Sequence, residues 1–176
     1  MEFDKKILFD ISSGLYIVGS SLGMKMNAQV ANSVIQVSSD PVIVTVCINK
    51  NNLTHQYIKE SGKFSISVLS DKVSLEFVGW FGFRSGLKIN KFDNEQFEFS
   101  YLIEGTDDWK IPVVTDYSTS FLLAEVISSH DVGTHTMFFG KVIDAKKISD
   151  DPVLSYQDYH VKKNGTTSKN APTYIK

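Results

Sequence analysis

In the stretch Lys63-Phe64-Ser65-Ile66-Ser67-Val68-Leu69, polar and apolar residues alternate strictly from Lys63 to Val68. Successive side chains of a β-strand point to opposite faces of the sheet, so the pattern places Phe64, Ile66 and Val68 together on one face. The stretch is therefore expected to be a half-buried strand, with one face in the core.

Apolar runs rich in β-branched residues lie on both sides of this stretch. Residues 15–18 are bounded by Gly14 and Gly19, and residues 41–48 begin directly after Asp40. Both runs are typical of strands. Further strands are expected at residues 31–37, 97–103, 119–128 and 135–148, with His130-Asp131-Val132-Gly133 as the hairpin turn between the last two.

Helix is expected in only two short segments, residues 52–61 and residues 71–80, the second capped by Ser70 or Asp71. Many short strands, glycine-containing turns and little helix indicate an antiparallel barrel or sandwich. The chain has 176 residues, 42% of them hydrophobic, and no linker or low-complexity segment. Residues 1–176 are therefore expected to form one domain.

The charge of the chain is nearly balanced. There are 18 Lys and Arg residues and 20 Asp and Glu residues, a formal net charge of −2, which argues against nucleic acid as a partner. Residues 1–10 are charged and lack the apolar core of a signal peptide, and no apolar run reaches the ~20 residues that span a bilayer. A cytoplasmic protein without a membrane partner is expected.

Cys47 is the only cysteine, so the chain forms neither an internal disulfide nor a CxxC metal or redox pair. Redox chemistry would therefore need a bound cofactor. Cys47 is flanked by apolar residues and is expected to be a buried, unreactive thiol. The sequence holds no multi-His arrangement, and no metal site is expected.

Small and amide side chains fill the segment Met26-Asn27-Ala28-Gln29-Val30-Ala31-Asn32-Ser33, where a core strand would carry Val or Ile. Small side chains let a flat ligand approach the backbone. Amides suit a ring edge that carries both donors and acceptors, such as the pyrimidine side of an isoalloxazine. An irregular edge strand with a bulge is the plainer alternative.

A second cluster lies where a strand ends and a helix begins, at Cys47-Ile48-Asn49-Lys50-Asn51-Asn52-Leu53-Thr54-His55. The free N–H groups of a helix N-terminus, the charge of Lys50 and the Thr54 hydroxyl suit a phosphate group. Ordinary capping by Asn51 or Asn52 would explain the amides without any ligand.

A third cluster interleaves basic residues with Gly and Ser, at Phe81-Gly82-Phe83-Arg84-Ser85-Gly86-Leu87-Lys88-Ile89-Asn90-Lys91. Arg84 can form paired hydrogen bonds with phosphate oxygens, Ser85 can donate, and the two lysines add charge. The alternative is a solvated basic turn that the two phenylalanines anchor in the core.

His135 stands at the start of a strand, beside a turn, where it could lie near a flavin or guide a nicotinamide. A lone His on a strand is more often a hydrogen-bonded structural residue. The polar residues 162–171 are expected to form a loop able to close over a ligand.

The order of these clusters along the chain resembles the flavin reductase-like family, with its FMN-binding split barrel. The stretches that carry the resemblance are NAQVANSVIQVSSDP at 27–41, NKNNLTH at 49–55, FSISVL at 64–69 and GTHTMFFG at 133–140. The similarity runs from about residue 8 to residue 174. It is closest to the branch of flavoredoxin and the flavin domain of high-molecular-weight rubredoxin.

The resemblance implies a mostly β, Greek-key-like split barrel with a few short helices, assembled as a homodimer with flavin sites beside the subunit interface. It places residues 27–33 along the isoalloxazine and ribityl chain and His135 near the ring as the catalytic candidate. The residues that it places at the phosphate are Asn49, Lys50, Thr54, Arg84, Ser85, Lys88 and Lys91. The residues expected to bind FMN are Asn27, Ala28, Gln29, Val30, Ala31, Asn32, Ser33, Cys47, Asn49, Lys50, Thr54, Phe81, Gly82, Arg84, Ser85, Gly86, Lys88 and Lys91.

The function that the resemblance implies is an FMN-dependent oxidoreductase that uses NADH or NADPH. It is either an NAD(P)H:flavin reductase or an electron-transfer flavoprotein that passes electrons to a separate acceptor such as rubredoxin. The sequence lacks a GxGxxG motif, so a nicotinamide nucleotide would stack on the flavin in the open site. The alternative from another class is a non-catalytic FMN-binding or storage protein. A pyridoxamine phosphate oxidase-like split barrel shares the architecture, but the order of the motifs favours the flavin reductase branch.

Overall fold

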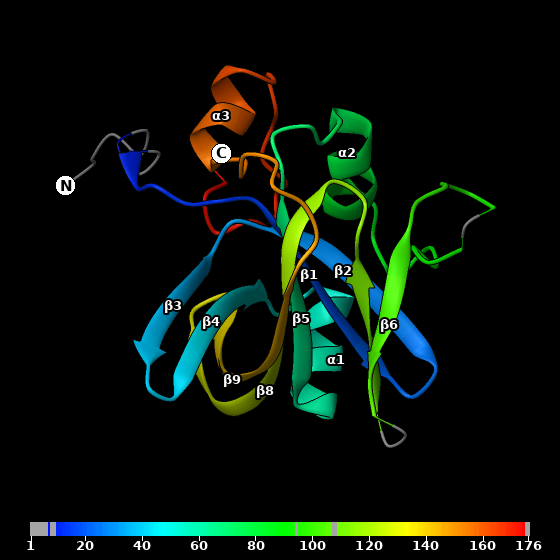
Figure 1. Ribbon diagram of the computed structural model, residues 1–176, viewed down its shortest axis with the longest axis vertical. Helices are drawn as coiled ribbons and strands as arrows, with labels where there is room; N and C mark the ends of the chain where they lie inside the picture. The colour runs from blue at the N-terminus through cyan, green and yellow to red at the C-terminus, as the bar shows by residue number, and fades with distance from the viewer. Residues whose placement is uncertain (1–6, 8–9, 94, 107–108, 175–176) are drawn as a thin grey trace.

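Seven strands form one curled antiparallel sheet in the computed structural model, which describes residue 7 and residues 10–93, 95–106 and 109–174 (Figure 1). The N-terminal stretch 1–10 therefore lies largely outside the described residues. Neighbouring strands follow the order β2-β1-β5-β8-β9-β4-β3. Their bounds are β1 (Tyr16–Leu22), β2 (Lys25–Ala31), β3 (Val34–Ser39), β4 (Val42–Asn49), β5 (Lys63–Leu69), β8 (Ser118–Val132) and β9 (His135–Lys147).

A separate hairpin and three short helices complete the fold. The hairpin consists of β6 (Tyr101–Gly105) and β7 (Lys110–Val114), and the helices are α1 (Leu53–Ser61), α2 (Leu75–Phe83) and α3 (Tyr156–Val161). None of the helices described is long and apolar enough to cross a bilayer. The predicted mostly β, split-barrel fold with a few short helices is confirmed.

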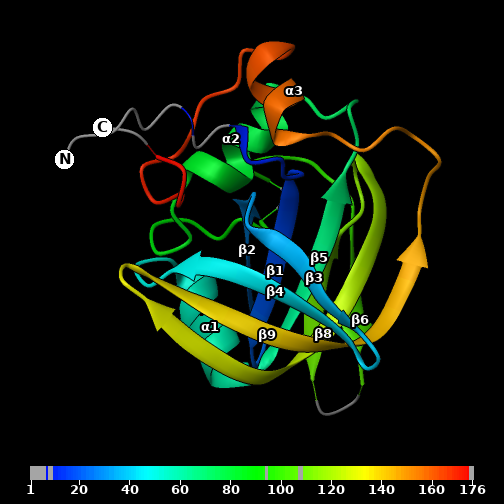
Figure 2. The same ribbon diagram turned by 90° about the vertical axis from the view of Figure 1, so that its left-hand side faces the viewer.

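β2 and β3 are the two outer strands of the sheet, yet only Asn32 and Ser33 separate them in the chain. Seven strands laid flat would put the edges roughly 29 Å apart at about 4.8 Å per strand, whereas the three residue steps from Ala31 to Val34 span at most about 11 Å. The sheet must therefore curl until its edges meet at this corner (Figure 2). The two edges are not hydrogen-bonded to each other, so the barrel is split.

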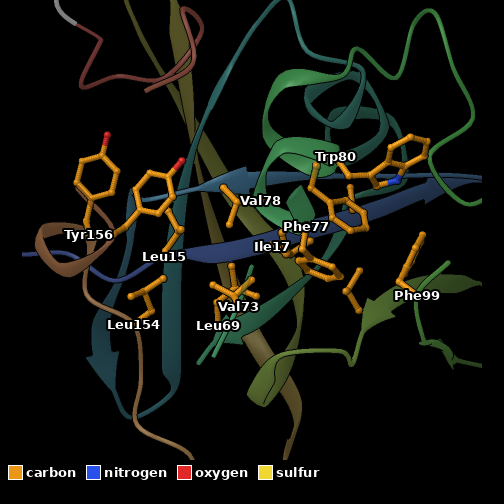
Figure 3. Packing of buried hydrophobic residues seen from close by; sticks show 14 of the residues in the cluster. Leu15, Ile17, Leu69, Val73, Phe77, Val78, Trp80, Phe99, Leu154 and Tyr156 are labelled. Atoms are coloured by element: carbon orange, nitrogen blue, oxygen red, sulfur yellow. The ribbon is translucent and has the colours of Figure 1, made fainter. Parts of the chain in front are cut away.

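Two hydrophobic clusters lie on the two sides of this curl. The first fills the interior with side chains from β1, β4, β5 and β9 and receives Ile58 from α1. The second packs α2 against the outer face of β1, where Phe77 and Val78 lie over Ile17, with Leu154 and Tyr156 at one end (Figure 3). Together they hold α1 and α2 on either side of β2.

β5 is buried on both faces, so the prediction of a half-buried strand is wrong. Ser65 and Ser67 point away from the barrel interior, and both are 1% exposed. The β6–β7 hairpin covers this face, and the Ser65 hydroxyl donates to the Pro112 carbonyl at 2.5 Å. The covering strand lies 47 residues further along the chain, so the local alternation could not reveal it.

Two of the expected strands have different bounds. Residues 31–37 form the end of β2 and most of β3 rather than one strand, because Asn32 and Ser33 turn the chain between the two edges. β6 begins at Tyr101, later than expected, because Phe97 and Phe99 pack around Phe77 instead of pairing.

Helix and turn boundaries also shift. α2 begins at Leu75 with Ser74 as its N-cap, whose hydroxyl accepts a hydrogen bond from the Phe77 N–H at 3.1 Å. Ser70 instead extends the sheet through a bridge with Val153. The β8–β9 turn is Gly133-Thr134, since the residues before it are still paired in the ladder. The sequence did not predict β7 or α3.

Gly140 on β9 tests how tightly the barrel interior is packed. A Cβ atom at this position would lie 2.5 Å from the Phe64 ring and 2.9 Å from the Ala124 Cβ. Because a close-packed core accommodates an added methyl group only by strain, Gly140→Ala should lower the free energy of unfolding by about 1–3 kcal/mol. Urea denaturation followed by tryptophan fluorescence measures this change.

Gly79→Ala is the matched control. Gly79 lies within α2, and apart from its chain neighbours and the backbone of the helix no atom of a described residue comes within 4 Å of an added Cβ. Alanine there should leave stability unchanged or raise it by up to about 1 kcal/mol, because glycine is a weak helix former. Equal losses in the two variants would contradict the packing argument.

Candidate functional site

A cavity of about 790 Å³ opens beside the corner where β2 runs into β3. Four segments far apart in the chain form its walls: the second half of β2, the passage from β4 to α1, the end of α2 with the loop to residue 91, and residues 166–174. Figure 2 shows this tail on the same side of the molecule as the loop that follows α2. The curl of the sheet thus brings the predicted clusters to one place.

Asn27 and Gln29 present amide groups in the wall formed by β2. Asn27 Nδ2 donates to Thr54 Oγ1 at 2.7 Å, which holds this amide against α1. Gln29 Oε1 is buried and has no hydrogen-bond partner among the described residues. A buried acceptor without a partner costs roughly 1–3 kcal/mol, so this oxygen favours a ligand that carries an N–H donor.

Two glycines, one in the last turn of α2 and one in the loop after it, let this part of the chain lie directly against β2. An added Cβ at Gly86 would overlap the side-chain amide of Asn27, and one at Gly82 would lie 3.4 Å from the Val30 Cβ. A larger residue at Gly86 would push the loop away from β2. The glycines predicted at a phosphate loop therefore also set the width of the cavity.

Positive charge gathers in the cavity. Four cationic side chains line it, and no Asp or Glu residue does within the described part of the chain. None of the four forms an ion pair with a described residue. They are Arg84, Lys88, Lys91 and Lys169. An anion bound here would meet no competing carboxylate, even though the whole chain is slightly acidic.

Lys91 differs from the other three cations because it is buried, with 2% exposed. Its Nζ donates to the carbonyl oxygens of Ala28 at 2.9 Å and Phe81 at 2.8 Å. Burial lowers the pKa of Lys91 to about 7, because removing an ammonium from water disfavours the charged form. Lys91 therefore fastens β2 to the end of α2, whereas the sequence suggested a free loop cation.

Asn170 anchors the middle of the tail. Its side-chain Nδ2 donates to Asn52 Oδ1 at 2.8 Å, and its carbonyl lies 3.1 Å from His135 Nε2. The other ring nitrogen of His135 lies 2.8 Å from Thr134 Oγ1. Both ring nitrogens of His135 thus have partners, and His135 contacts the tail from outside the cavity lining.

The Tyr156 hydroxyl holds both ends of the same tail. It lies 2.7 Å from Thr167 Oγ1 and 2.9 Å from Thr173 Oγ1. Asn32 Nδ2 also donates to Thr173 Oγ1, at 3.1 Å, and ties the tail to the β2–β3 corner. Residues expected to form a loop near a ligand therefore form one wall of the cavity.

Most residues predicted from the sequence to bind the cofactor share this one cavity. Those in its lining are Asn27, Gln29, Val30, Ala31, Asn32, Cys47, Asn49, Phe81, Gly82, Arg84, Ser85, Gly86, Lys88 and Lys91. Cys47 is half-buried rather than buried. Burial raises the pKa of its thiol, which reduces the thiolate fraction at neutral pH.

Five predicted residues, His135 among them, do not line the cavity. Ala28 points to the opposite face of β2 and packs beneath α2. Thr54 is buried behind Asn27. The Ser33 hydroxyl donates to Asn32 Oδ1 at 3.3 Å.

Lys50 also lies outside the lining, because an acidic residue holds it elsewhere. Its Nζ lies 2.9 Å from Asp131 Oδ2 in the β8–β9 hairpin. The hydrogen bonds from Thr136 and from Lys50 hold the pKa of Asp131 below its usual range. The predicted role of Lys50 as a phosphate ligand is therefore not supported by its position.

Sequence reasoning missed part of the lining. The missed residues include Asn51, Asn52, Tyr156, Tyr159 and Lys169. The two asparagines were interpreted as possible caps, and Lys169 lies in a tail recognised only as a polar loop. A run of residues from 159 to 174 that holds three lysines and no carboxylate was the signal available for Lys169.

The cavity can bind a ligand with an anionic group and a flat polar ring. Its cations suit the anion, and the amides of β2 with the unpaired Gln29 oxygen suit a ring edge that carries N–H donors. The described lining holds no carboxylate or histidine to act as a general base. These side chains can bind and orient a ligand that carries its own reactive group.

Comparison with known proteins gives one consistent match. The flavin reductase like domain matches residues 8–165. The chain is 41% identical over 172 residues to a ferric-chelate reductase (NAD(P)H) of Archaeoglobus fulgidus, covering 98% of each protein. It is 40% identical over 171 residues to a high molecular weight rubredoxin of Moorella thermoacetica, covering 97% of this chain and 72% of that protein.

A solved structure supports the same fold. The NADH:FAD oxidoreductase of Streptomyces globisporus C-1027 aligns with a TM-score of 0.74, covering 88% of this chain and 91% of that one. The two sequences are 21% identical, so this likeness supports the fold alone.

Tyr156→Phe tests whether the tail is held by hydrogen bonds. Losing the hydroxyl removes its contacts with Thr167 and Thr173, each hydrogen bond being worth roughly 0.5–1.5 kcal/mol. Amide hydrogen exchange should then speed up about threefold to tenfold in residues 166–174 and stay unchanged in β8 and β9. Tyr57→Phe is the control, because the Tyr57 hydroxyl on α1 forms no hydrogen bond with a described residue. Unchanged exchange in the tail of the Tyr156 variant would contradict this account.

Proposed function

Because the chain belongs to the flavin reductase-like family, we propose that it is a cytoplasmic, NAD(P)H-dependent FMN oxidoreductase that passes electrons to a separate acceptor. The observation that carries the proposal is the cavity with four cations and no carboxylate within the described part of the chain. A flavin-dependent reductase needs a site that holds the anionic flavin cofactor, because protein side chains do not carry out hydride transfer themselves.

The FMN phosphate fits the positive part of the cavity. A phosphate monoester carries about −1.5 to −2 charges at pH 7, and in a chain with net charge −2 local cations must hold it. Arg84 can form paired hydrogen bonds with its oxygens, and Lys88 and Lys169 add charge. Their lack of ion-pair partners among described residues leaves them available for an anion.

The amide wall of β2 suits the ring of the cofactor. The buried Gln29 Oε1 would gain a partner from a ring N–H, and Thr54 holds the Asn27 amide in place. When bound, the flavin supplies hydride acceptance and electron transfer. The protein's own groups orient the ring, exclude water on the tail side through residues 166–174 and hold the phosphate.

NADH or NADPH as the electron donor is supported by the name of the A. fulgidus relative, a ferric-chelate reductase (NAD(P)H). The sequence has no GxGxxG motif, so the nicotinamide is proposed to enter the open cavity rather than a separate nucleotide domain. A rubredoxin is proposed as the acceptor, on the strength of the M. thermoacetica relative named high molecular weight rubredoxin.

Anaerobic mixing of the protein with FMN and NADH or NADPH tests the activity. Loss of absorbance at 340 nm, together with bleaching of the flavin band near 450 nm, is the expected outcome. Protein that binds FMN and leaves it oxidised under these conditions would instead be a storage protein, and the oxidoreductase proposal would be wrong.

Arg84→Ala tests the phosphate site, with Lys50→Ala as the matched control. One lost charge-assisted hydrogen bond, worth roughly 1.5–3 kcal/mol, should weaken FMN about tenfold or more. Riboflavin, which lacks the phosphate, should bind both variants as it binds the wild type. Lys50→Ala should leave FMN affinity unchanged, because Lys50 pairs with Asp131 outside the cavity. Flavin fluorescence quenching measures all of these affinities, and equal losses for FMN and riboflavin would refute a phosphate contact.

A homodimer is proposed from the apolar side chains that the sheet leaves exposed. Ile35, Val37, Val42, Ile127 and Ile143 are 41–61% exposed on the neighbouring strands β3, β4, β8 and β9. Burying them against a second copy would remove this surface from water. Light scattering should therefore give twice the 19.7 kDa chain mass at micromolar concentration, and a monomer would contradict the proposal.

A further inference from the structure

Lys91 is a buried lysine in the wall of the cavity that is proposed to bind the FMN phosphate. Its Nζ contacts the Ala28 and Phe81 carbonyls, and no carboxylate of a described residue pairs with it. The Trp80 Nε1 donates to the Lys91 carbonyl at 3.0 Å, so its backbone is also fixed. The position of this amine is thus set by two elements, β2 and α2, before any ligand enters.

We propose that Lys91 is a positioning residue that gains a proton when an anionic ligand enters the cavity, so that flavin binding through the phosphate is coupled to proton uptake. The proposal rests on the FMN site proposed above. It assigns to Lys91 a role different from that of the exposed Arg84, Lys88 and Lys169, which are proposed to contact the phosphate directly.

The two carbonyl contacts are compatible with either protonation state. A neutral amine still has two N–H donors, which is the number used here, while the ammonium has three. Phe81 lies in the last turn of α2, where unpaired carbonyls carry partial negative charge and favour the ammonium. Desolvation opposes the ammonium, and the balance lowers the pKa of Lys91 to about 7. The link between β2 and α2 therefore persists while the charge can change.

Charged groups around Lys91 do not offset its desolvation in the absence of a ligand. The loop after α2 contributes Arg84 and Lys88, the tail contributes Lys169, and the acid of α2, Glu76, lies in its first turn, away from Phe81. The nearest acid in sequence, Asp93, accepts the Glu95 N–H and lies outside the cavity lining. β2 contributes only the uncharged amides of Asn27 and Gln29 to the polar side chains of the cavity lining near Lys91. An entering anion would thus be the first negative charge in the cavity.

The direction of the effect follows from linkage. An anion nearby raises the pKa of Lys91, since an opposite charge within about 4–6 Å favours the charged form by roughly one to three pKa units. Between the free and bound pKa values the complex holds more protons than the free protein, so binding takes up protons. FMN affinity should therefore fall about tenfold from pH 6.5 to pH 9.

Isothermal titration calorimetry at pH 8 tests the coupling. FMN is titrated into the full chain in Hepes and in Tris, which differ in ionisation enthalpy and add no phosphate that could compete with the phosphate of FMN. The wild type should take up roughly half a proton per FMN, and riboflavin clearly less. At this pH the flavin phosphate is already ionised, so its own titration does not contribute.

Three variants separate Lys91 from its neighbours. Lys91→Arg is permanently charged and should bind FMN without proton uptake and with a flat pH profile. Lys91→Met should also abolish the proton uptake. Lys88→Met should weaken FMN binding, but the proton uptake on binding should remain. A role confined to folding would change stability and leave the proton stoichiometry of the folded variants untouched.

Two results would overturn the proposal: FMN binding to the wild type without proton uptake, or equal uptake by the wild type and Lys91→Arg. The first needs no variant, so a misfolded Lys91→Met protein leaves the test intact. Failure of the wild type to bind FMN at all would instead refute the FMN site, and with it this inference.

Discussion

The two-residue connection Asn32-Ser33 is the constraint on which the rest of the structure depends. It joins the opposite edges of a seven-stranded sheet, so the sheet curls and the edges meet without pairing. An unpaired edge leaves backbone groups of β2 in need of partners. Lys91 supplies one by donating to the Ala28 carbonyl, and the loop that carries Lys91 becomes the wall opposite β2. The split in the barrel and the cavity beside it thus have one cause.

Local charge, and not the charge of the whole chain, decides what this cavity can bind. A net charge of −2 spread over the surface is screened within about 8 Å at physiological ionic strength. A cation about 4 Å from an anion near a protein surface contributes about 4 kcal/mol at an effective dielectric constant of 20. Arg84 and Lys88 therefore outweigh the distant acids for any ligand that reaches the cavity.

Periodicity predicted the strands that form the centre of the sheet, whereas contacts between distant segments set the features that the sequence missed. The alternation of residues 63–69 located β5, yet it could not show that β7 would bury Ser65. Lys50 follows a strand and was predicted to bind an anion, but its side chain pairs with Asp131, which lies far along the chain. β7 carries Pro112 and has no alternation, so nothing local identified it as a strand. The residues on β2 and after α2 that line the cavity could be predicted because their unusual composition is itself local.

The cavity combines one rigid wall with one that can move. The β2 wall is part of the sheet, with the hydrophobic clusters on both of its sides, so it moves only if the core is disrupted. The tail wall is held mainly by side-chain hydrogen bonds through Asn170, Thr167 and Thr173, each worth roughly 0.5–1.5 kcal/mol. Opening the tail therefore costs a few kcal/mol, well below the roughly 5–15 kcal/mol of global unfolding. A large ligand can enter by releasing the tail while the amides of β2 keep their positions.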